Sequence, residues 1–208
     1  MNNIAMISAT LAWIGMIVIG TTISATYENR PGDQGYAPTF AVSKHDVEQA
    51  KVSKTKFHII MFVHPKCPCS RASISELRNL METFPSLKAT VFFYKPATAK
   101  SGWEKTELWK TASAVENITP QIDIDGQKAK SYRVVTSGEV LLYDASERLV
   151  FSGGITGARG HVGDNLGEDT IEKILTKHFN TAGQKFSAPV FGCRIMKDGT
   201  QVCSAKSL

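Results

Sequence analysis

The stretch from Phe57 to Leu80, FHIIMFVHPKCPCSRASISELRNL, carries two cysteines between an apolar run and a helical pattern. The apolar run, Ile59 to Val63, is typical of a strand that is buried on both faces. After the cysteines, apolar residues recur at helical spacing, at Ile74, Leu77, Leu80, Met81 and Phe84. The pattern therefore predicts a buried strand that leads through Cys67 and Cys69 into a helix.

The start of this helix is expected close to the cysteines. Ser73 to Glu76 matches a capping box, and Ser70 is an alternative N-cap. Unpaired backbone N–H groups and the helix dipole favour negative charge at an N-terminus, so a thiolate there is stabilised and nucleophilic. We therefore expect redox or metal chemistry at Cys67 and Cys69 rather than two inert thiols that fill space in a core.

The composition sets limits on the rest of the chain. Its 208 residues, 42% of them hydrophobic, suffice for one substantial core and are few for two. Four cysteines are too few for a disulfide scaffold. The net charge of +5 includes a group of lysines before the first strand, but no nucleic-acid motif accompanies them, so we expect no nucleic-acid partner.

Residues 1–26 are expected to be a transmembrane anchor or a signal segment. Ile4 to Ile23 supplies about the 20 apolar residues that cross a bilayer. An uncleaved anchor is favoured, because no Lys or Arg precedes the apolar stretch and the cleavage signals are only fair. Arg30 after the segment argues mildly for a cytoplasmic domain. We nevertheless predict a periplasmic or equivalent extracytoplasmic domain, since a surface-anchored thiol domain suits an oxidising compartment.

The rest of the chain divides into a linker at 27–39, rich in Gly and Pro, a domain at 40–180 and a tail at 181–208. The domain's pattern is strand, helix, strand and helix, then a strand, a short helix, an antiparallel hairpin and a last helix. This order predicts an α/β fold with a mixed central sheet flanked by helices. The expected strands lie at 59–63, 89–94, 121–126, 139–143 and 149–152, and the later helices at 104–115, 127–134 and about 170–178.

The glycine-rich loop GGITGARGHVGDNLG, residues 153–167, precedes the last helix. Its glycines permit tight backbone paths, but it lacks the order of a dinucleotide fingerprint. Arg159 and His161 are therefore candidates for a wall beside the cysteines, with His161 favoured; a solvated turn is the alternative.

His64 lies three residues before Cys67, so His64, Cys67 and Cys69 form a candidate ligand set for copper or zinc. The spacing supplies no fourth ligand. We therefore expect no cofactor, with metal binding as the alternative, and assign His64 to tuning the neighbouring thiolate.

Cys193 and Cys203 lie in the tail, on either side of a turn signal at 197–199. In an oxidising compartment they are expected to form a disulfide that closes a hairpin. The alternative is that APVFGC, residues 188–193, folds back so that Cys193 resolves a disulfide at Cys67 or Cys69. Both alternatives stay open at this point.

A cysteine site between strand and helix, a crossover, a hairpin and a final helix is the thioredoxin arrangement. From about Phe40 to Phe179 the sequence resembles membrane-anchored thioredoxin-like proteins of the bacterial envelope, of the TlpA and ResA kind; the region Thr119 to Ser152 carries their Asp-x-Asp-Gly and Ala-x-x-Tyr-x-Val patterns. HPKCPCSRASISEL, FSGGITGARGHVGDNLG and APVFGC are similar to a thioredoxin-like group labelled RedB.

The resemblance implies a thiol–disulfide oxidoreductase that acts on protein thiols or disulfides of the cell envelope. Cys67 is the expected attacking thiolate, Cys69 resolves the mixed disulfide, and Pro68 stiffens the link between them. Two features depart from the family. The motif is Cys-Pro-Cys followed by Ser70 instead of Cys-x-x-Cys, and Gly138 stands where thioredoxins place a cis-proline.

Overall fold

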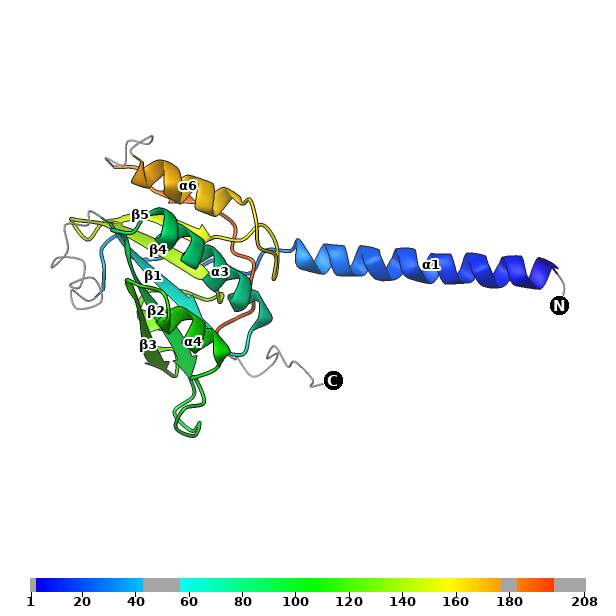
Figure 1. The fold of residues 1–208 in the computed structure, drawn as a ribbon, viewed down its shortest axis with the longest axis horizontal. Coiled ribbons are helices and arrows are strands. Elements are labelled where there is room, and N and C mark those ends of the chain that lie inside the picture. The colour runs from blue at the N-terminus through cyan, green and yellow to red at the C-terminus, as the bar shows by residue number, and fades with distance from the viewer. Residues whose placement is uncertain (1–2, 43–56, 177–182, 197–208) are drawn as a thin grey trace.

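The computed structural model describes residues 3–42, 57–176 and 183–196, and it contains a mixed sheet with the strand order β3-β2-β1-β4-β5-β6 (Figure 1). β1 pairs in parallel with β2, and β2 with β3, whereas β4 is antiparallel to both β1 and β5. The described strands are β1 Phe57–Val63, β2 Lys88–Lys95, β3 Ile118–Ile124, β4 Glu139–Asp144, β5 Leu149–Gly154 and β6 Phe186–Ser187. The described helices are α1 Asn3–Glu28, α3 Pro68–Thr83, α4 Glu107–Ser113, α5 Gln127–Ser131 and α6 Leu166–Leu175. The predicted α/β fold class is confirmed.

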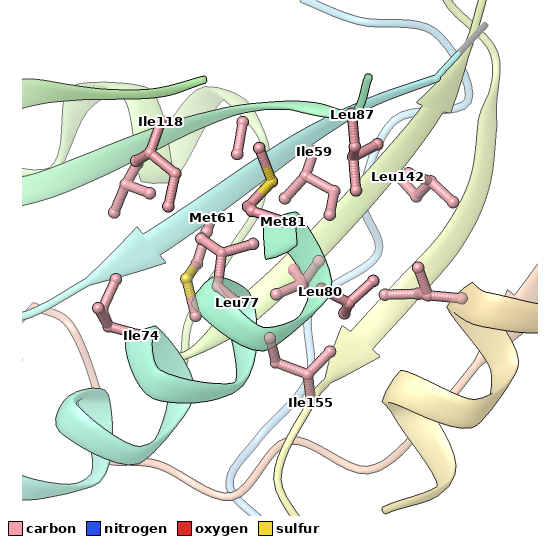
Figure 2. Packing of buried hydrophobic residues seen from close by; sticks show 14 of the residues in the cluster. Ile59, Met61, Ile74, Leu77, Leu80, Met81, Leu87, Ile118, Leu142 and Ile155 are labelled. Atoms are coloured by element: carbon pink, nitrogen blue, oxygen red, sulfur yellow. The ribbon is translucent and has the colours of Figure 1, made fainter. Parts of the chain in front are cut away.

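The sheet is buried on both faces because side chains alternate along its central strands. Odd-numbered residues of β1 pack with α3 and α6 on one face, where Figure 2 shows Ile59 and Met61 beside Leu77. Even-numbered residues of β1, such as Phe62, pack on the other face with Tyr132, which ends α5. The unbroken apolar run of β1 thus has the physical role that its sequence predicts.

Helix α3 begins three residues before the earlier of the two predicted caps. Its N-cap is Cys67, and Pro68 follows at the first helical position, where a fixed φ and a missing N–H cost nothing. Ser73 is therefore inside the helix, and its hydroxyl donates to the Cys69 carbonyl at 3.4 Å. The capping box at Ser73 and the N-cap at Ser70 were both wrong.

Helix α6 also begins earlier than predicted. Its N-cap is Asn165, whose side-chain oxygen accepts a hydrogen bond of 2.8 Å from the Glu168 backbone N–H, whereas the sequence predicted a start near residue 170. α4 and α5 are shorter than predicted, and the predicted last residues of the final helix, 177–178, lie outside the described residues.

Helix α1 extends away from the domain (Figure 1), and none of its residues is buried. By length and composition it is, in the described part of the chain, the one helix able to cross a membrane. The segment after it, expected to be a linker, instead packs along the domain. The Gly32 N–H donates to the Val190 carbonyl at 2.8 Å, and the Leu149 N–H donates to the Thr39 carbonyl at 2.8 Å.

The tail is also part of the domain in its described portion. β6 extends the sheet as a parallel neighbour of β5, and Ala188, Val190 and Ile195 are buried. A Cβ on Gly153 of β5 would lie 2.5 Å from the Ala188 carbonyl oxygen, so the strand and the tail meet backbone to backbone. The tail therefore runs from the edge of the sheet back across the domain.

Candidate active site

Cys67 and Cys69 lie at the connection between β1 and α3, and both are free thiols with buried side chains. The Cys67 N–H donates to the His64 carbonyl at 3.1 Å, which closes the tight turn between strand and helix. Pro68 occupies the first helical position between the two cysteines. The Cys-Pro-Cys motif thus forms the first turn of the helix, with Cys67 at its positive end.

The pKa values of the two thiols are shifted in opposite directions. The pKa of Cys67 is lowered to about 6, chiefly because the Cys69 thiol donates a hydrogen bond to it and because Ser70 adds further hydrogen bonds that outweigh burial. The pKa of Cys69 is raised, first by that same hydrogen bond, then by burial and by the nearby Cys67 charge. At neutral pH Cys67 is the thiolate and Cys69 holds the proton.

Ser70 and Ser137 extend this hydrogen-bond network. The Ser70 hydroxyl donates to Cys67 and lies 2.6 Å from the Ser137 hydroxyl, which accepts the His64 N–H at 2.8 Å. A hydroxyl has one proton to donate. Because the Ser70 hydroxyl donates its proton to the Cys67 thiolate, the Ser137 hydroxyl is the donor in the bond between the two serines. A chain of two hydroxyls, Ser137 to Ser70, therefore stabilises the Cys67 thiolate.

His64 does not act on the thiolate as a charged group. Its ring stacks on Tyr94 at 5.6 Å between centroids and meets the edge of Trp103 at 5.7 Å. Its Nδ1 accepts a 3.2 Å hydrogen bond from the Lys66 N–H, and burial followed by the Lys66 charge lowers its pKa to about 4. His64 is consequently neutral at pH 7, and its part at the site is to close the turn through its backbone.

Cys193 lies beside the two thiols. The sulfur atoms of Cys67, Cys69 and Cys193 are all within 4.8 Å of one another. Cys193 is disulfide-bonded, and neither Cys67 nor Cys69 is its partner; Cys203 lies outside the described residues. The tail thus folds back onto the dithiol, and Cys193 is engaged in a disulfide; its pairing with Cys203 and a resolving role for it both stay predictions.

Backbone pairing between the tail and the loop before β4 holds Cys193 in place. The Ser137 N–H donates to the Cys193 carbonyl at 2.8 Å, and the Ile195 N–H donates to the Val135 carbonyl at 2.9 Å. Gly192 fits where a Cβ would lie 1.9 Å from the Ser137 carbonyl oxygen. This short antiparallel contact delivers a sulfur atom to the edge of the dithiol.

Gly138 comes next in the same loop, at the position where the sequence resemblance to thioredoxins places their cis-proline. Its φ is +93°, and a Cβ there would lie 2.7 Å from the Ser73 hydroxyl oxygen of α3. Its N–H donates to the Phe62 carbonyl at 2.8 Å. Gly138 therefore lets the loop pass close against both β1 and α3, which brings Ser137 to Ser70.

Arg159 is the residue of the glycine-rich loop that reaches the cysteines. Its Nη1 lies 4.0 Å from the Cys193 sulfur and donates to the Gly192 carbonyl, and its charge opposes the rise in the Cys69 pKa. His161, which the sequence favoured, lies instead beside Glu28 at the end of α1, with 3.2 Å between Nε2 and Oε2. Arg159 is held by two hydrogen bonds, from its N–H to the carbonyl of Glu28 at the end of α1 at 3.0 Å and from its Nε to the Arg30 carbonyl at 3.1 Å.

Sequence reasoning did not identify Ser137 or the tail's pairing with the loop. Ser137 stands in a polar stretch without a recognisable motif, and its role depends on a contact 67 residues away in the chain. Ser70 had a signal, because it directly follows Cys-Pro-Cys at the family's second cysteine position.

The strand order, the hairpin and the dithiol at the N-terminus of α3 define a thioredoxin-like fold. No protein-family model matches the sequence, and a search of the curated proteins finds no match. Two solved structures are similar over most of their length. They are a hypothetical protein from Sinorhizobium meliloti 1021 and an uncharacterised conserved protein from Geobacillus kaustophilus, with TM-scores of 0.56 and 0.55.

Both structures share 16% sequence identity with this chain. The matches cover 82% of the chain and 96% of the Sinorhizobium protein, and 83% of the chain and 95% of the Geobacillus protein. A lesser likeness, with a TM-score of 0.44 and 20% identity over 70% of this chain and 98% of the other, is to the thioredoxin domain of a thiol-disulfide oxidoreductase from Bacteroides vulgatus. These likenesses concern the fold.

Proposed function

We propose that the protein is a membrane-anchored thiol–disulfide oxidoreductase whose domain faces the extracytoplasmic side. The observation that carries this proposal is the pair of free thiols in the first turn of α3, where the pKa of Cys67 is lowered and that of Cys69 is raised. Exchange requires one nucleophilic thiolate and a second sulfur within reach. The helix α1 supports the anchor, and the sequence resemblance to envelope proteins of the TlpA, ResA and RedB kind supports the location.

The reaction proceeds in two exchanges. The Cys67 thiolate attacks one sulfur of a partner protein's disulfide; the partner's S–S bond breaks, a mixed disulfide forms, and the other partner sulfur leaves as a thiolate. Cys69 then loses its proton to this thiolate or to solvent and attacks the Cys67 sulfur. The Cys67–Cys69 disulfide forms, and the partner leaves with both of its sulfurs reduced.

The structure suggests how Cys69 becomes a nucleophile at the second step. Its pKa is raised first by donating a hydrogen bond to the Cys67 thiolate, then by burial and then by that thiolate's charge. Once Cys67 is in a mixed disulfide, the hydrogen bond to a thiolate and the thiolate's charge are lost, while burial still raises the Cys69 pKa and the Arg159 charge still lowers it. The loss of the Cys67 thiolate thus makes Cys69 easier to ionise at the step in which Cys69 must attack.

The test uses the full chain in detergent micelles and measures reduction of a model protein disulfide at pH 7. We expect Cys67→Ser to lower the rate at least about a hundredfold, because a hydroxyl does not exchange with disulfides at this pH. Cys69→Ser should accumulate a mixed disulfide with the substrate. Equal activity of the parent and Cys67→Ser, or an inactive parent with both protein and small disulfides, would refute the proposal.

A second candidate function, binding or delivery of copper or zinc, rests on the three clustered sulfur atoms. Among the described residues, the groups close enough to share an ion are Cys67, Cys69 and Cys193, without His64. Such a donor set suits a soft ion such as copper(I) once Cys193 is reduced. Titration of copper(I) and of zinc into fully reduced protein tests it, with His64→Ala expected to leave any affinity unchanged and Cys193→Ser expected to lower it.

A further inference from the structure

Specific hydrogen bonds and close backbone packing hold the tail so that Cys193 lies beside the dithiol. Two backbone hydrogen bonds, of 2.8 and 2.9 Å, fix the stretch around Cys193 against the loop 135–137, and a Cβ on Gly192 would collide with that loop. Arg159 adds a hydrogen bond to the Gly192 carbonyl and a charged group 4.0 Å from the Cys193 sulfur. A disulfide that only closed a hairpin would have no need of this position.

We infer that the disulfide of Cys193 is the internal exchange partner of the Cys67–Cys69 dithiol, so that the chain carries a relay of two electrons between its core and its tail. The inference rests on the proposed function, because it requires Cys67 to be an exchanging thiolate. The leaving sulfur belongs to the residue bonded to Cys193, for which Cys203 is the remaining cysteine of the sequence.

The relay balances in atoms and electrons. The Cys67 thiolate attacks the Cys193 sulfur, the S–S bond of Cys193 breaks, and a Cys67–Cys193 bond forms while the sulfur that was bonded to Cys193 leaves as a thiolate. Cys69 gives up its proton, which passes through solvent to that leaving thiolate, and attacks Cys67. The products are a Cys67–Cys69 disulfide, a Cys193 thiolate and a thiol on the former partner of Cys193, so the dithiol is oxidised and the disulfide of Cys193 is reduced.

Geometry and charge both favour this order of events. Cys67 is the ionised member of the dithiol, and Cys193 is within 4.8 Å of it. The thiolate that Cys193 becomes in the second exchange lies beside the Arg159 guanidinium. In the structure the dithiol is reduced and Cys193 is oxidised, which is the reactant state of the relay.

The relay predicts a trapped intermediate. In Cys69→Ser the second exchange is blocked, so the Cys67–Cys193 disulfide should accumulate in the full chain in detergent micelles without any external disulfide. Alkylation of free thiols, proteolysis without reductant and mass spectrometry identify the linked peptides.

Gly192→Ala tests the position of Cys193 while every cysteine stays in place. The added Cβ must push the tail off the Ser137 carbonyl, so combined with Cys69→Ser it should lose most of the Cys67–Cys193 link. Gly157→Ala is the matched control in the neighbouring loop, since its Cβ would lie 3.4 Å from the nearest atom. In the Cys69→Ser background, Gly157→Ala should keep the link.

The outcomes separate the relay from the proposed function. An active parent that depends on Cys67, together with no Cys67–Cys193 link in Cys69→Ser, would overturn the relay and leave the oxidoreductase intact. A link from Cys67 to Cys203 alone would also overturn the role of Cys193. A parent that exchanges with no disulfide, but binds copper(I) tightly through Cys193 when reduced, would overturn both and favour the metal site.

Discussion

The dithiol and the wall beside it are built in different ways. Cys67 and Cys69 are positioned by one continuous stretch, in which β1 ends and Pro68 begins α3. The wall consists of Ser137, Arg159 and Cys193, which come from a loop before β4, a loop before α6 and the tail. The comparison teaches that a reactive cysteine pair and the hydrogen bonds that chiefly set its pKa values can be encoded locally, while the side chains that surround the pair are assembled from distant parts of the chain.

The largest expected effect comes from a core substitution between α3 and β1, the two elements that position Cys67 and Cys69. Leu77 of α3 is fully buried against β1, so Leu77→Ala should lower the free energy of unfolding by about 2–5 kcal/mol. Denaturant unfolding of the full chain in micelles measures it. Leu166→Ala on the exposed side of α6 is the control, with an expected change within about 0.5 kcal/mol. Equal effects of the two changes would contradict the packing described.

The next effect concerns a buried glutamate that directly follows the loop carrying Ser137. Glu139 at the start of β4 is fully buried, and burial raises its pKa to about 7 from an ordinary 4.5, against hydrogen bonds from Ser152 and Val135. Below pH 4.5 the folded and unfolded chains both hold this proton, so it adds no pH dependence there. Between pH 4.5 and 7 only the folded chain keeps it, so stability falls as pH rises.

At about 1.4 kcal/mol for each pH unit in that window, the loss reaches about 3 kcal/mol above pH 7. Glu139→Gln should therefore stabilise the protein more at pH 8 than at pH 5, measured by denaturant unfolding at the two values. A difference between parent and variant that does not change with pH would show that Glu139 ionises normally in the folded protein.

A smaller effect, about tenfold, is expected in the alkylation rate of Cys67 between pH 5 and pH 7. With a pKa of about 6, Cys67 should react with an alkylating reagent about tenfold faster at pH 7 than at pH 5, because the thiolate fraction rises by that factor. Cys69→Ala removes the donated hydrogen bond and should move the midpoint to higher pH. An unchanged midpoint would assign the lowered pKa to Ser70 and the helix N-terminus instead.

The smallest expected effect distinguishes two residues of the glycine-rich loop. Arg159→Gln should slow release of the mixed disulfide by Cys69 by about two- to fivefold, because a nearby positive charge that favours the thiolate is lost. His161→Gln should leave that step unchanged, since His161 lies beside Glu28. Single-turnover kinetics with a protein disulfide measures both variants, and equal slowing would mean that the loop acts as a whole.

Much of the fold could be predicted from the sequence because its signals are local. The apolar run of β1, the helical spacing of α3 and the hairpin of β4 and β5 each follow from side-chain periodicity within one segment. Errors occurred at helix starts. The serines of 70–75 suit an N-cap as isolated residues, but the proline after Cys67 starts the helix before them.

Tertiary contacts decided that the segment after α1 and the described part of the tail pack against the domain. Residues 29–39 are polar and rich in Gly and Pro, as a linker is, yet Gly35 fits where a Cβ would lie 1.6 Å from the Arg133 carbonyl oxygen. The same composition thus serves either a free spacer or a close backbone contact. Composition reports what a segment is able to do, and the surface that it meets decides which of these it does.

The sequence by itself determined that two cysteines flank a proline at the junction of a buried strand and a helix, and so determined the kind of chemistry to expect. Only the tertiary structure decided that Cys193 joins them, that Arg159 rather than His161 faces the sulfur atoms, and that His64 is neutral in an aromatic setting. The physical reason is range. Helix starts, strand periods and the hydrogen bonds that lower the Cys67 pKa depend on neighbours in the chain, whereas the Cys193 sulfur and the Arg159 charge are brought to the dithiol from distant segments.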